Sequence, residues 1–420
     1  MDKILGWKKP VRLHLWVMPD AGFDTRKIIE SKLKIFKKSH PGVEISLSII
    51  PWSQAWDRLM NLVKREEKTD LPDVIQVGNT WTATLAYLGA IAELTDEVSQ
   101  INKKDYIPQS WKYCYLPGNE RIFAVPWFTD LRVLYYRRDI LKKFNLDEKN
   151  LIDWKSFEET CRIVNGIKLN GRRHFALSLS GQREEIWTND LAPWIWGSGG
   201  DFFSEDLKKA IFQQKGLEGI SFFFNLIVQR FIPLIGRDTV FPIGNFFTGN
   251  YTFQFSGMWP IHSYFNPHHS DYSPVAAKNY GVTSFPSGPA GRSTFIGGSN
   301  LVISRFTKHF EQSWQLIAFL SRPEVQSDYA RNIGKLPCQY AAWDELFEDH
   351  QQVGNVFRKS LQFASALPVI STFGTIEKII SDTCRKILDV IRFHEYSNEI
   401  LKKEFGMSAK DVEHILSLYD

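Results

Sequence analysis

Residues 121 to 138 read R-I-F-A-V-P-W-F-T-D-L-R-V-L-Y-Y-R-R. Two runs of β-branched and aromatic residues, Ile122–Val125 and Arg132–Tyr136, are typical of strands. They flank the insert Pro126–Asp130, and Pro126 has no N–H to donate, so we expect a strand end or a bulge here. The aromatic and polar side chains of the insert suit a binding crevice better than a core. A bulge that carries core aromatics is the alternative.

The length and charge of the chain limit its possible functions. With 420 residues the chain can form two domains, each with a substantial core. The formal net charge is only +4, and basic residues alternate with acids, as in Lys64–Lys68. This pattern is typical of a solvated helix face, whereas nucleic-acid-binding proteins gather Lys and Arg on one face. No apolar run approaches the roughly 20 residues that cross a bilayer.

Cysteines and tryptophans suggest different roles. The four cysteines are widely spaced and form no C-x-x-C pair, so a zinc ribbon or redox motif is not expected. Isolated buried thiols are favoured over two disulfides at Cys114, Cys161, Cys338 and Cys384. Most tryptophans should pack in cores, because each buries a large apolar area. Those in polar loops rich in Gly and Pro could instead stack on a ligand: Trp81, Trp127, Trp194, Trp196 and Trp259.

The first third of the chain alternates strands and helices. Apolar runs predict strands at Val11–Met18, Val43–Ile50 and Asp73–Val77. Helical spacing predicts the connecting helices Asp24–Lys38 and Gln54–Lys68. This order predicts an α/β fold with a parallel, doubly wound sheet.

The loops after these three strands should meet at one edge of the sheet, where open α/β sheets bind ligands. The loops are Met18–Phe23, Pro51–Trp56 and Gly78–Thr82. They bring together polar groups and tryptophans: Asp20, Trp52, Gln54, Trp56, Asp57, Asn79, Thr80 and Trp81. This mixture suits a sugar ring, which has hydroxyls around its edge and C–H groups on its faces.

The remainder of the chain continues the α/β pattern. The expected helices are Trp154–Ile167, Gly216–Gln229 and Phe310–Leu320, with a largely helical C-terminal tail. The expected strands are Phe175–Leu179, Asn250–Phe255, Tyr280–Phe285 and Leu301–Ser304, the last preceded by a loop at Gly297–Asn300. After Trp196 a helix should break into a Gly-rich turn.

No motif predicts a metal, a cofactor or a catalytic nucleophile. The group His262, His268, His269 and Asp271 has no helical metal-ligand spacing and is better explained as an exposed loop. Gly288–Thr294 lacks the Lys and the spacing of a phosphate loop, so a turn is favoured. The pairs Glu158-Glu159 and Glu184-Glu185 could serve a glycosidase, but adjacent acids on a helix point apart.

Four stretches resemble the extracellular solute-binding proteins of ABC importers, in the group similar to maltodextrin-binding proteins. They are Leu71–Thr95, Phe123–Asp139, Gly297–Leu301, and Ala318–Gln326 together with Gly334–Pro337. The resemblance extends over about residues 11 to 400, and the order and spacing of the stretches make it specific.

The resemblance implies a two-lobed fold of type II. Each lobe would have a mostly parallel sheet flanked by helices, and the ligand would lie in a cleft between lobes that closes by a hinge motion. The N-terminal lobe would comprise residues 11–126 and 281–332, and the C-terminal lobe residues 127–280 and 333–420. The chain would cross between lobes at the second stretch, at 280–288 and at 332–337.

The resemblance also implies ligand contacts. The positions that match are Asp20, Asn79, Trp81, Trp127, Asp130, Trp194 or Trp196, Trp259, Gly298, Ser299, Asn300 and Phe373. Trp52 joins them from the loops described above.

The expected function is therefore a receptor, without enzymatic activity, that delivers a carbohydrate, favoured as an oligosaccharide, to a membrane permease. It would act as an extracellular or periplasmic monomer. The family normally carries a secretion signal, often with a lipid anchor; the start of this chain resembles neither, so a trimmed form or a cytoplasmic chain is possible. One alternative is a receptor for glycerol phosphate or another polar solute, which would need Arg12, Arg121 or Arg132 in the site. Another is a carbohydrate-active enzyme.

Overall fold

The computed structural model describes residues 10–19, 24–64, 71–116, 120–169, 171–178, 184–233, 251–263, 265–269 and 272–418. The chain divides into two compact units. Unit 1 comprises residues 1–129, 298–346 and 369–371, and unit 2 comprises residues 130–297, 347–368 and 372–420. This division assigns 281–297 to unit 2 and 127–129, 333–346 and 369–371 to unit 1, and so differs from the expected lobe boundaries at those four segments.

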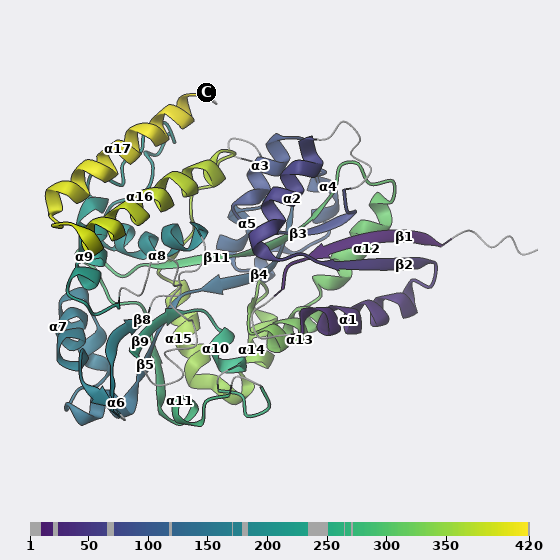
Figure 1. Ribbon diagram of the computed structural model, residues 1–420. Helices are drawn as coiled ribbons and strands as arrows, with labels where there is room; N and C mark the ends of the chain where they lie inside the picture. Colours follow the sequence, from purple (N-terminus) through teal and green to yellow (C-terminus); the bar gives the residue numbers. More distant parts are fainter. Residues whose placement is uncertain are drawn as a thin grey trace, which may run out of the picture. The chain divides into compact units, whose positions relative to one another are not determined.

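Unit 1 contains the predicted β-α-β-α-β arrangement. Strands β1 (Val11–Val17), β2 (Val43–Ile49) and β3 (Val74–Gly78) are parallel, in the order β2-β1-β3. Helices α1 (Thr25–Ser39) and α2 (Trp52–Lys64) connect them and lie on opposite faces of the sheet (Figure 1). The prediction of a doubly wound parallel sheet is thus confirmed for this part of the chain.

Helix α1 shows how local sequence determines an element. The Asp24 side chain accepts a hydrogen bond from the Lys27 N–H, which satisfies one free donor of the first turn. Ile29 and Phe36 lie on the same face and are fully buried. Lys37 and Lys38 occupy the last turn, where positive charge complements the helix dipole.

Two further strands differ from the sequence-based expectation. Strand β4 spans Val125–Leu131, so the segment Pro126–Asp130 is itself the strand and not an insert between two strands. The discontinuity instead falls at Arg132, before β5 (Val133–Arg137). Pro126 is the second residue of β4, close to a strand end, as its missing N–H requires.

Strand β11 extends over Thr294–Ile303 and pairs antiparallel with β3. The expected loop at Gly297–Asn300 is therefore wrong, because these residues are part of the strand. Gly298 has a φ of 141° and its α-carbon lies against the Phe128 carbonyl oxygen, which a β-carbon would meet at 2.1 Å. Glycines in this segment predicted a loop, but they permit close approach of two strands.

The other elements of unit 1 complete its sheet and cover it. They are α3 (Trp81–Tyr87), α4 (Thr95–Val98), η1 (Lys103–Asp105), α5 (Pro108–Lys112), α12 (Phe310–Leu320), α13 (Pro323–Ile333), β12 (Leu336–Pro337) and α14 (Ala341–Leu346). Strand β12 pairs antiparallel with β4 at the end of the sheet.

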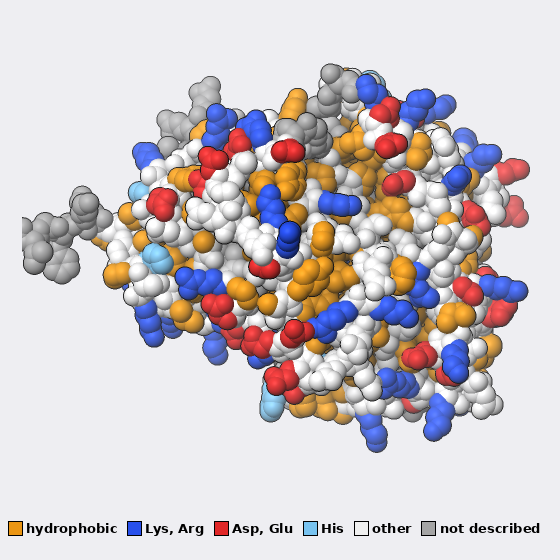
Figure 2. All heavy atoms as spheres, turned by 180° about the vertical axis from the view of Figure 1, so that it is seen from behind, with side chains coloured by type: hydrophobic (Ala, Val, Ile, Leu, Met, Phe, Trp, Pro, Cys, Tyr) orange, Lys and Arg blue, Asp and Glu red, His pale blue; other side chains and the backbone are white. Residues whose placement is uncertain are grey.

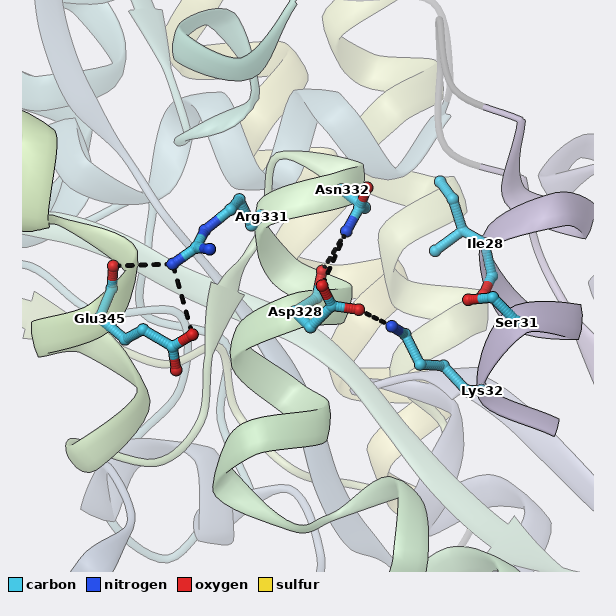
Figure 3. A network of polar contacts seen from close by, with 7 residues as sticks. All are labelled: Ile28, Ser31, Lys32, Asp328, Arg331, Asn332 and Glu345. Carbon is cyan, nitrogen blue, oxygen red and sulfur yellow. Dashed lines mark hydrogen bonds and ion pairs between the residues drawn. The ribbon is translucent and has the colours of Figure 1, made fainter. Parts of the chain in front are cut away.

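A polar network connects α1 to α13 in unit 1 (Figure 3). The Lys32 ammonium pairs with the Asp328 carboxylate, and the Lys32 side chain is only 10% exposed. Asn332 donates from Nδ2 to the Asp328 carbonyl oxygen at 2.7 Å, and Arg331 donates to the Glu345 carbonyl oxygen at 2.9 Å. These contacts join packed helices, so the network has a structural role.

Unit 2 is built on a second, smaller sheet. Its strand order is β10 (Tyr280–Thr283), β5, β9 (Tyr251–Ser256) and β8 (Phe175–Ser178). The β8–β9 pairing is parallel, whereas β9–β5 and β5–β10 are antiparallel. Among the described strands, the pairings in β2-β1-β3 are parallel, whereas most pairings in the unit 2 sheet are antiparallel.

The other elements of unit 2 are mostly helices, together with three short strands. The elements are α6 (Arg138–Lys143), η2 (Glu148–Leu151), α7 (Trp154–Val164), β6 (Lys168–Leu169), β7 (Arg172–Arg173), α8 (Glu184–Gly197), α9 (Gly216–Val228), α10 (Trp259–His262), α11 (Pro274–Asn279), η4 (Glu348–His350), α15 (Gln351–Leu361), β13 (Ala364–Ser365), α16 (Phe373–Phe393) and α17 (Asn398–Ser417). The predicted turn after α8 is confirmed, because Gly199 has a φ of 80° just beyond the helix.

The surface and the thiols agree with the sequence pattern. On the face drawn in Figure 2, Lys and Arg side chains alternate with Asp and Glu and form no single basic patch. All four cysteines are free and buried, which confirms the prediction of isolated thiols. In the described parts of the chain, no helix has the length and apolar character needed to cross a membrane.

Candidate functional site

Three tryptophans gather at the carboxyl ends of the parallel strands in unit 1. The Trp81 ring lies 5.8 Å from the Trp52 ring and 5.2 Å from the Trp56 ring, measured between centroids. The Trp52 indole N–H donates to the Pro19 carbonyl oxygen at 3.1 Å, so the segment after β1 reaches the same place. The predicted convergence of the three loops is confirmed, and we call Trp52, Trp56 and Trp81 the aromatic edge. Asp20 lies outside the described residues.

Asn79 precedes Trp81 of the aromatic edge by two residues in the sequence, and its side-chain oxygen accepts no hydrogen bond. Its backbone N–H donates to the Gly298 carbonyl oxygen at 3.2 Å, and its side chain follows β3 directly. Asn79 is 6% exposed, and its buried Oδ1 has no hydrogen-bond partner. A buried acceptor without a partner is costly, so this atom is suited to receive a donor from a ligand.

Gln76, which sequence reasoning did not select, holds this edge in place. Its Oε1 accepts from the Met18 N–H at 2.8 Å, and its Nε2 donates to the Ser299 hydroxyl at 3.2 Å. Gln76 is fully buried in β3, so its amide joins β3 to the segment after β1 and to β11. A single Gln in an apolar strand is a signal that could have found it, because a buried amide needs partners.

Several predicted ligand contacts in unit 1 make internal contacts. The Trp127 ring is 1% exposed and stacks on Tyr329 at 4.6 Å between centroids. Asn300 donates from Nδ2 to the Thr82 hydroxyl at 3.0 Å, and Ser299 is bonded to Gln76. Gly298 faces the β4 backbone. These contacts give the residues a packing role, and their predicted ligand contacts stay predictions.

A different kind of group lies at the start of unit 2. The Asp130 carboxylate pairs with the Arg132 guanidinium at 2.9 Å, and their side chains are 19% and 14% exposed. The Arg132 Nε is buried and has no hydrogen-bond partner. Gly257 approaches Asp130 so closely that a β-carbon would meet its Oδ1 at 2.1 Å. Asp130 is therefore held between an arginine and a glycine.

Arg132 lines a pocket inside unit 2, which we call the unit 2 pocket. Its polar lining comprises Arg132, Ser178, Asn189 and Asp190, and its apolar lining comprises Leu177, Pro193, Trp194, Phe223, Phe255 and Phe285. Trp194 anchors the apolar wall, with ring centroids 4.8 Å from Phe285 and 5.6 Å from Phe255. Arg132 lies between β4 and β5, and its side chain reaches the pocket from there. By contrast, Arg12 and Arg121 are exposed and pair with Glu44 and Glu93.

Asp190 differs from an ordinary surface carboxylate. Burial raises the pKa of its carboxyl from the ordinary 3.8 to about 6; the positive charge of Arg132 opposes this shift and the negative charge of Asp130 adds to it. The carboxyl of Asp190 is thus protonated at a higher pH than an ordinary carboxyl.

The other predicted contacts in unit 2 are dispersed. Trp196 is half-buried and donates from Nε1 to Asp201 at 3.0 Å. Trp259 is half-buried at the first residue of α10. Phe373 is fully buried with its ring 6.4 Å from Phe203, which is the environment of a core residue. Among these three, Trp259 and Trp196 keep the partial exposure that a stacking platform requires.

Sequence reasoning missed the polar lining of the unit 2 pocket. Ser178 ends β8, whereas Asn189 and Asp190 lie on α8. The Asn-Asp pair within an otherwise apolar stretch, next to Trp194, is the signal that could have drawn attention to them.

Comparison with known proteins agrees with this architecture. The family model for bacterial extracellular solute-binding proteins matches residues 22–327. The diacetylchitobiose binding protein DasA of Streptomyces coelicolor is 23% identical over 347 residues, which cover 80% of this chain and 75% of that protein. A protein of Deinococcus radiodurans, named as a probable ABC transporter-binding protein, is 25% identical over 279 residues, or 63% of each chain.

Among solved structures, the sugar-binding protein MalE of Xanthomonas citri has the same fold, with a TM-score of 0.79 at 23% identity. The match covers 97% of this chain and 98% of that protein. The fold is therefore the two-lobed, mixed α/β fold of the periplasmic binding proteins. The chain belongs to the family of bacterial extracellular solute-binding proteins.

Proposed function

We propose that this protein is the substrate-binding receptor of an ABC importer and that its ligand is a carbohydrate. The aromatic edge carries the proposal, because it places three tryptophans and the unpartnered Oδ1 of Asn79 where parallel strands end. Indole faces cover the C–H surfaces of a sugar ring, and a free amide oxygen accepts from a hydroxyl. The diacetylchitobiose and sugar-binding relatives support the same ligand class.

The number of aromatic side chains favours an oligosaccharide over a monosaccharide. Trp52 and Trp56 in unit 1 and Trp196 and Trp259 in unit 2 are all half-buried, so each can offer part of its ring. A chain of several sugar rings has a face to offer to each of these indoles, in whichever unit the indole lies. Binding in a hinge-closing cleft between lobes, as the resemblance implies, stays a prediction.

The expected partners follow from the family. A permease in the membrane would receive the sugar, and the receptor would work outside the cytoplasmic membrane as a monomer. We expect no chemical step. The related transporter-binding protein of Deinococcus radiodurans supports the link to an importer.

A receptor for glycerol phosphate or a similar anion is less favoured. Such a ligand needs an arginine whose charge is available, but Asp130 pairs with Arg132 at 2.9 Å and Asp190 lines the same pocket. Two carboxyl groups around one guanidinium leave no net positive charge for a phosphate.

A thermal-shift screen tests the proposed function. Neutral oligosaccharides and phosphorylated polyols are added separately, since a ligand that binds only the folded protein raises its melting temperature. We expect shifts with oligosaccharides alone, lost in Trp259→Ala and weakened in Trp52→Ala, which removes a half-buried ring of the aromatic edge. Sugar binding that survives both substitutions would overturn the assignment of these two residues, and a shift with polyol phosphates alone would overturn the ligand class.

Incubation with glycans tests the enzymatic alternative. The receptor should return every glycan intact. Product that forms with the wild type and is lost on replacing a carboxylate would establish an enzyme.

A further inference from the structure

Strand β1 of unit 1 carries a histidine whose ring contacts two hydrogen-bonding side chains. The His14 Nε2 lies 3.1 Å from the indole Nε1 of Trp16 and 2.8 Å from the Ser48 hydroxyl oxygen. Ser48 belongs to β2 and is paired in register with Trp16, so the three side chains lie on one face of the sheet. One ring nitrogen of His14 therefore serves two partners of different character.

The indole of Trp16 determines where His14 carries its proton. An indole N–H can only donate a hydrogen bond, so the His14 Nε2 must present its lone pair and the proton of the ring must lie on Nδ1. The Ser48 hydroxyl can donate or accept, so it fits this form as a second donor. The structure therefore selects the neutral imidazole with its proton on Nδ1.

A second proton on the ring would exchange the partner of Nε2. Both nitrogens of an imidazolium are donors, so Nε2–H can donate to the Ser48 oxygen but can no longer accept from Trp16. Trp16 is only 8% exposed, and a buried N–H that loses its acceptor is costly. His14 itself is half-buried, so a proton from solvent can reach its ring.

The charges around His14 do not compensate for its burial. The Asp73 carboxylate accepts from the His14 backbone N–H at 2.7 Å and from the Thr307 hydroxyl. Burial lowers the pKa of His14, and the Asp73 charge opposes this shift without cancelling it. Further along the same face, Arg12 and Glu44 pair with each other at 3.4 Å. Among the described residues, Asp73 is the charged group that acts on His14.

We propose that His14, Trp16 and Ser48 form a pH-sensitive switch in unit 1, in which uptake of a solvent proton moves the Nε2 hydrogen bond from Trp16 to Ser48. Strand β1 lies between β3 and β2 in the sheet, so the switch is in an interior strand. Release of the Trp16 indole weakens unit 1 at that position. The switch belongs to the fold of unit 1 and does not depend on the identity of the ligand.

The direction of the pH effect follows from the lowered pKa of His14. The folded chain binds this proton less tightly than the unfolded chain, in which the histidine has its ordinary pKa of 6.5. The contribution of neutral His14 to stability is complete above pH 6.5 and is lost as the pH falls through that value toward the folded-state pKa. Through His14, the equilibrium constant for unfolding should therefore rise several-fold between pH 7.5 and pH 5.

NMR spectroscopy of the whole chain, with isotope-labelled histidine and tryptophan nitrogens, tests the proposal. At pH 7.5 the wild type should carry the His14 proton on Nδ1. The Trp16 indole resonance, identified by its absence in Trp16→Phe, should shift as His14 is titrated. In His14→Gln the amide oxygen can still accept from Trp16, so the same resonance should not follow the pH. His394→Gln, which replaces an exposed histidine just after α16, is the matched control and should behave as the wild type.

Urea denaturation provides a second, independent measurement. The ratio of the unfolding constants of the wild type and His14→Gln should rise several-fold from pH 7.5 to pH 5, whereas the ratio for His394→Gln should stay constant. A proton on Nε2 at pH 7.5, a Trp16 resonance that does not follow His14, or a constant ratio for His14→Gln would each overturn the switch. If His14→Gln does not fold, the proton position and the Trp16 titration in the wild type still decide between these outcomes.

Discussion

The aromatic edge of unit 1 and the pocket of unit 2 are held together by different interactions. Trp81 is almost fully buried between Trp52 and Trp56, so the aromatic edge is preformed by packing. In the pocket, Asp130, Arg132 and Asp190 depend on one another's charge. Apolar packing responds little to pH, whereas a charge cluster depends on pH and its exposed charges are screened by salt. The two regions should therefore respond differently to substitution and to pH.

The largest expected effect is on the packed side of this comparison. Replacing Trp81 with Ala removes a buried indole that two other rings contact, so the free energy of unfolding should fall by about 3–5 kcal/mol. Trp52→Ala is the matched control; its half-buried ring should cost about half as much. Urea denaturation measures both. Equal losses would mean that Trp81 is not the centre of the aromatic edge.

On the charged side, Arg132→Ala leaves two carboxyl groups without a cation. The side chains of the Asp130–Arg132 pair are 19% and 14% exposed, so we expect a loss of about 2–4 kcal/mol at pH 7.5. The exposed pair Arg121–Glu93, with side chains 55% and 38% exposed, provides the control. Arg121→Ala should cost below about 1 kcal/mol. If Arg132→Ala and Arg121→Ala lowered the free energy of unfolding by similar amounts, the Asp130–Arg132 pair would be as open to water as the exposed pair.

The pH dependence of stability separates the two regions more finely. Because the folded-state pKa of Asp190 is raised from 3.8 to about 6, its contribution to stability is present below pH 3.8 and is lost as the pH rises through 6. Asp190→Asn should therefore exceed the wild type by about 1–3 kcal/mol at pH 7.5 and match it near pH 3.5. Denaturation at several pH values checks this. A constant difference across pH would contradict the raised pKa.

The smallest effect should come from Gly257→Ala. Its new β-carbon would meet the Asp130 Oδ1 at 2.1 Å, so the carboxylate must turn away from Arg132. Because the end of a side chain can move, stability should fall by only about 1 kcal/mol, while sugar affinity falls several-fold. Gly406→Ala on α17, where a β-carbon meets nothing within 4 Å, is the control. If the sugar affinity of Gly257→Ala were unchanged, the orientation of the Asp130 carboxylate would not depend on the residue at position 257.

Local sequence predicted unit 1 better than unit 2 for a physical reason. Strands β1, β2 and β3 follow one another with single helices between them, so strand ends and their tryptophans could be placed from periodicity alone. The partners of the unit 2 pocket come from distant segments. Arg132 and Asp190 are far apart in the chain, and no local pattern reveals that a sheet and a helix bring their charges together.

Two sequence-based predictions, at Gly298 and Trp127, were wrong or remain untested because strands approach each other closely at these positions. Gly298 predicted a loop, but it lies within β11. A glycine is needed there because the Phe128 carbonyl oxygen leaves no room for a side chain. Trp127, expected at a crevice, stacks on Tyr329 because the segment around it forms a continuous strand. In both cases a long-range contact decides between two locally acceptable structures.

The central claim is that the chain binds a neutral sugar without changing it. Its most direct test is calorimetric titration of the wild type with neutral oligosaccharides, followed by chromatography of the recovered sugar. The account predicts binding of one oligosaccharide per chain and recovery of that sugar intact. Absence of binding across the panel, or recovery of a cleaved sugar, would contradict it.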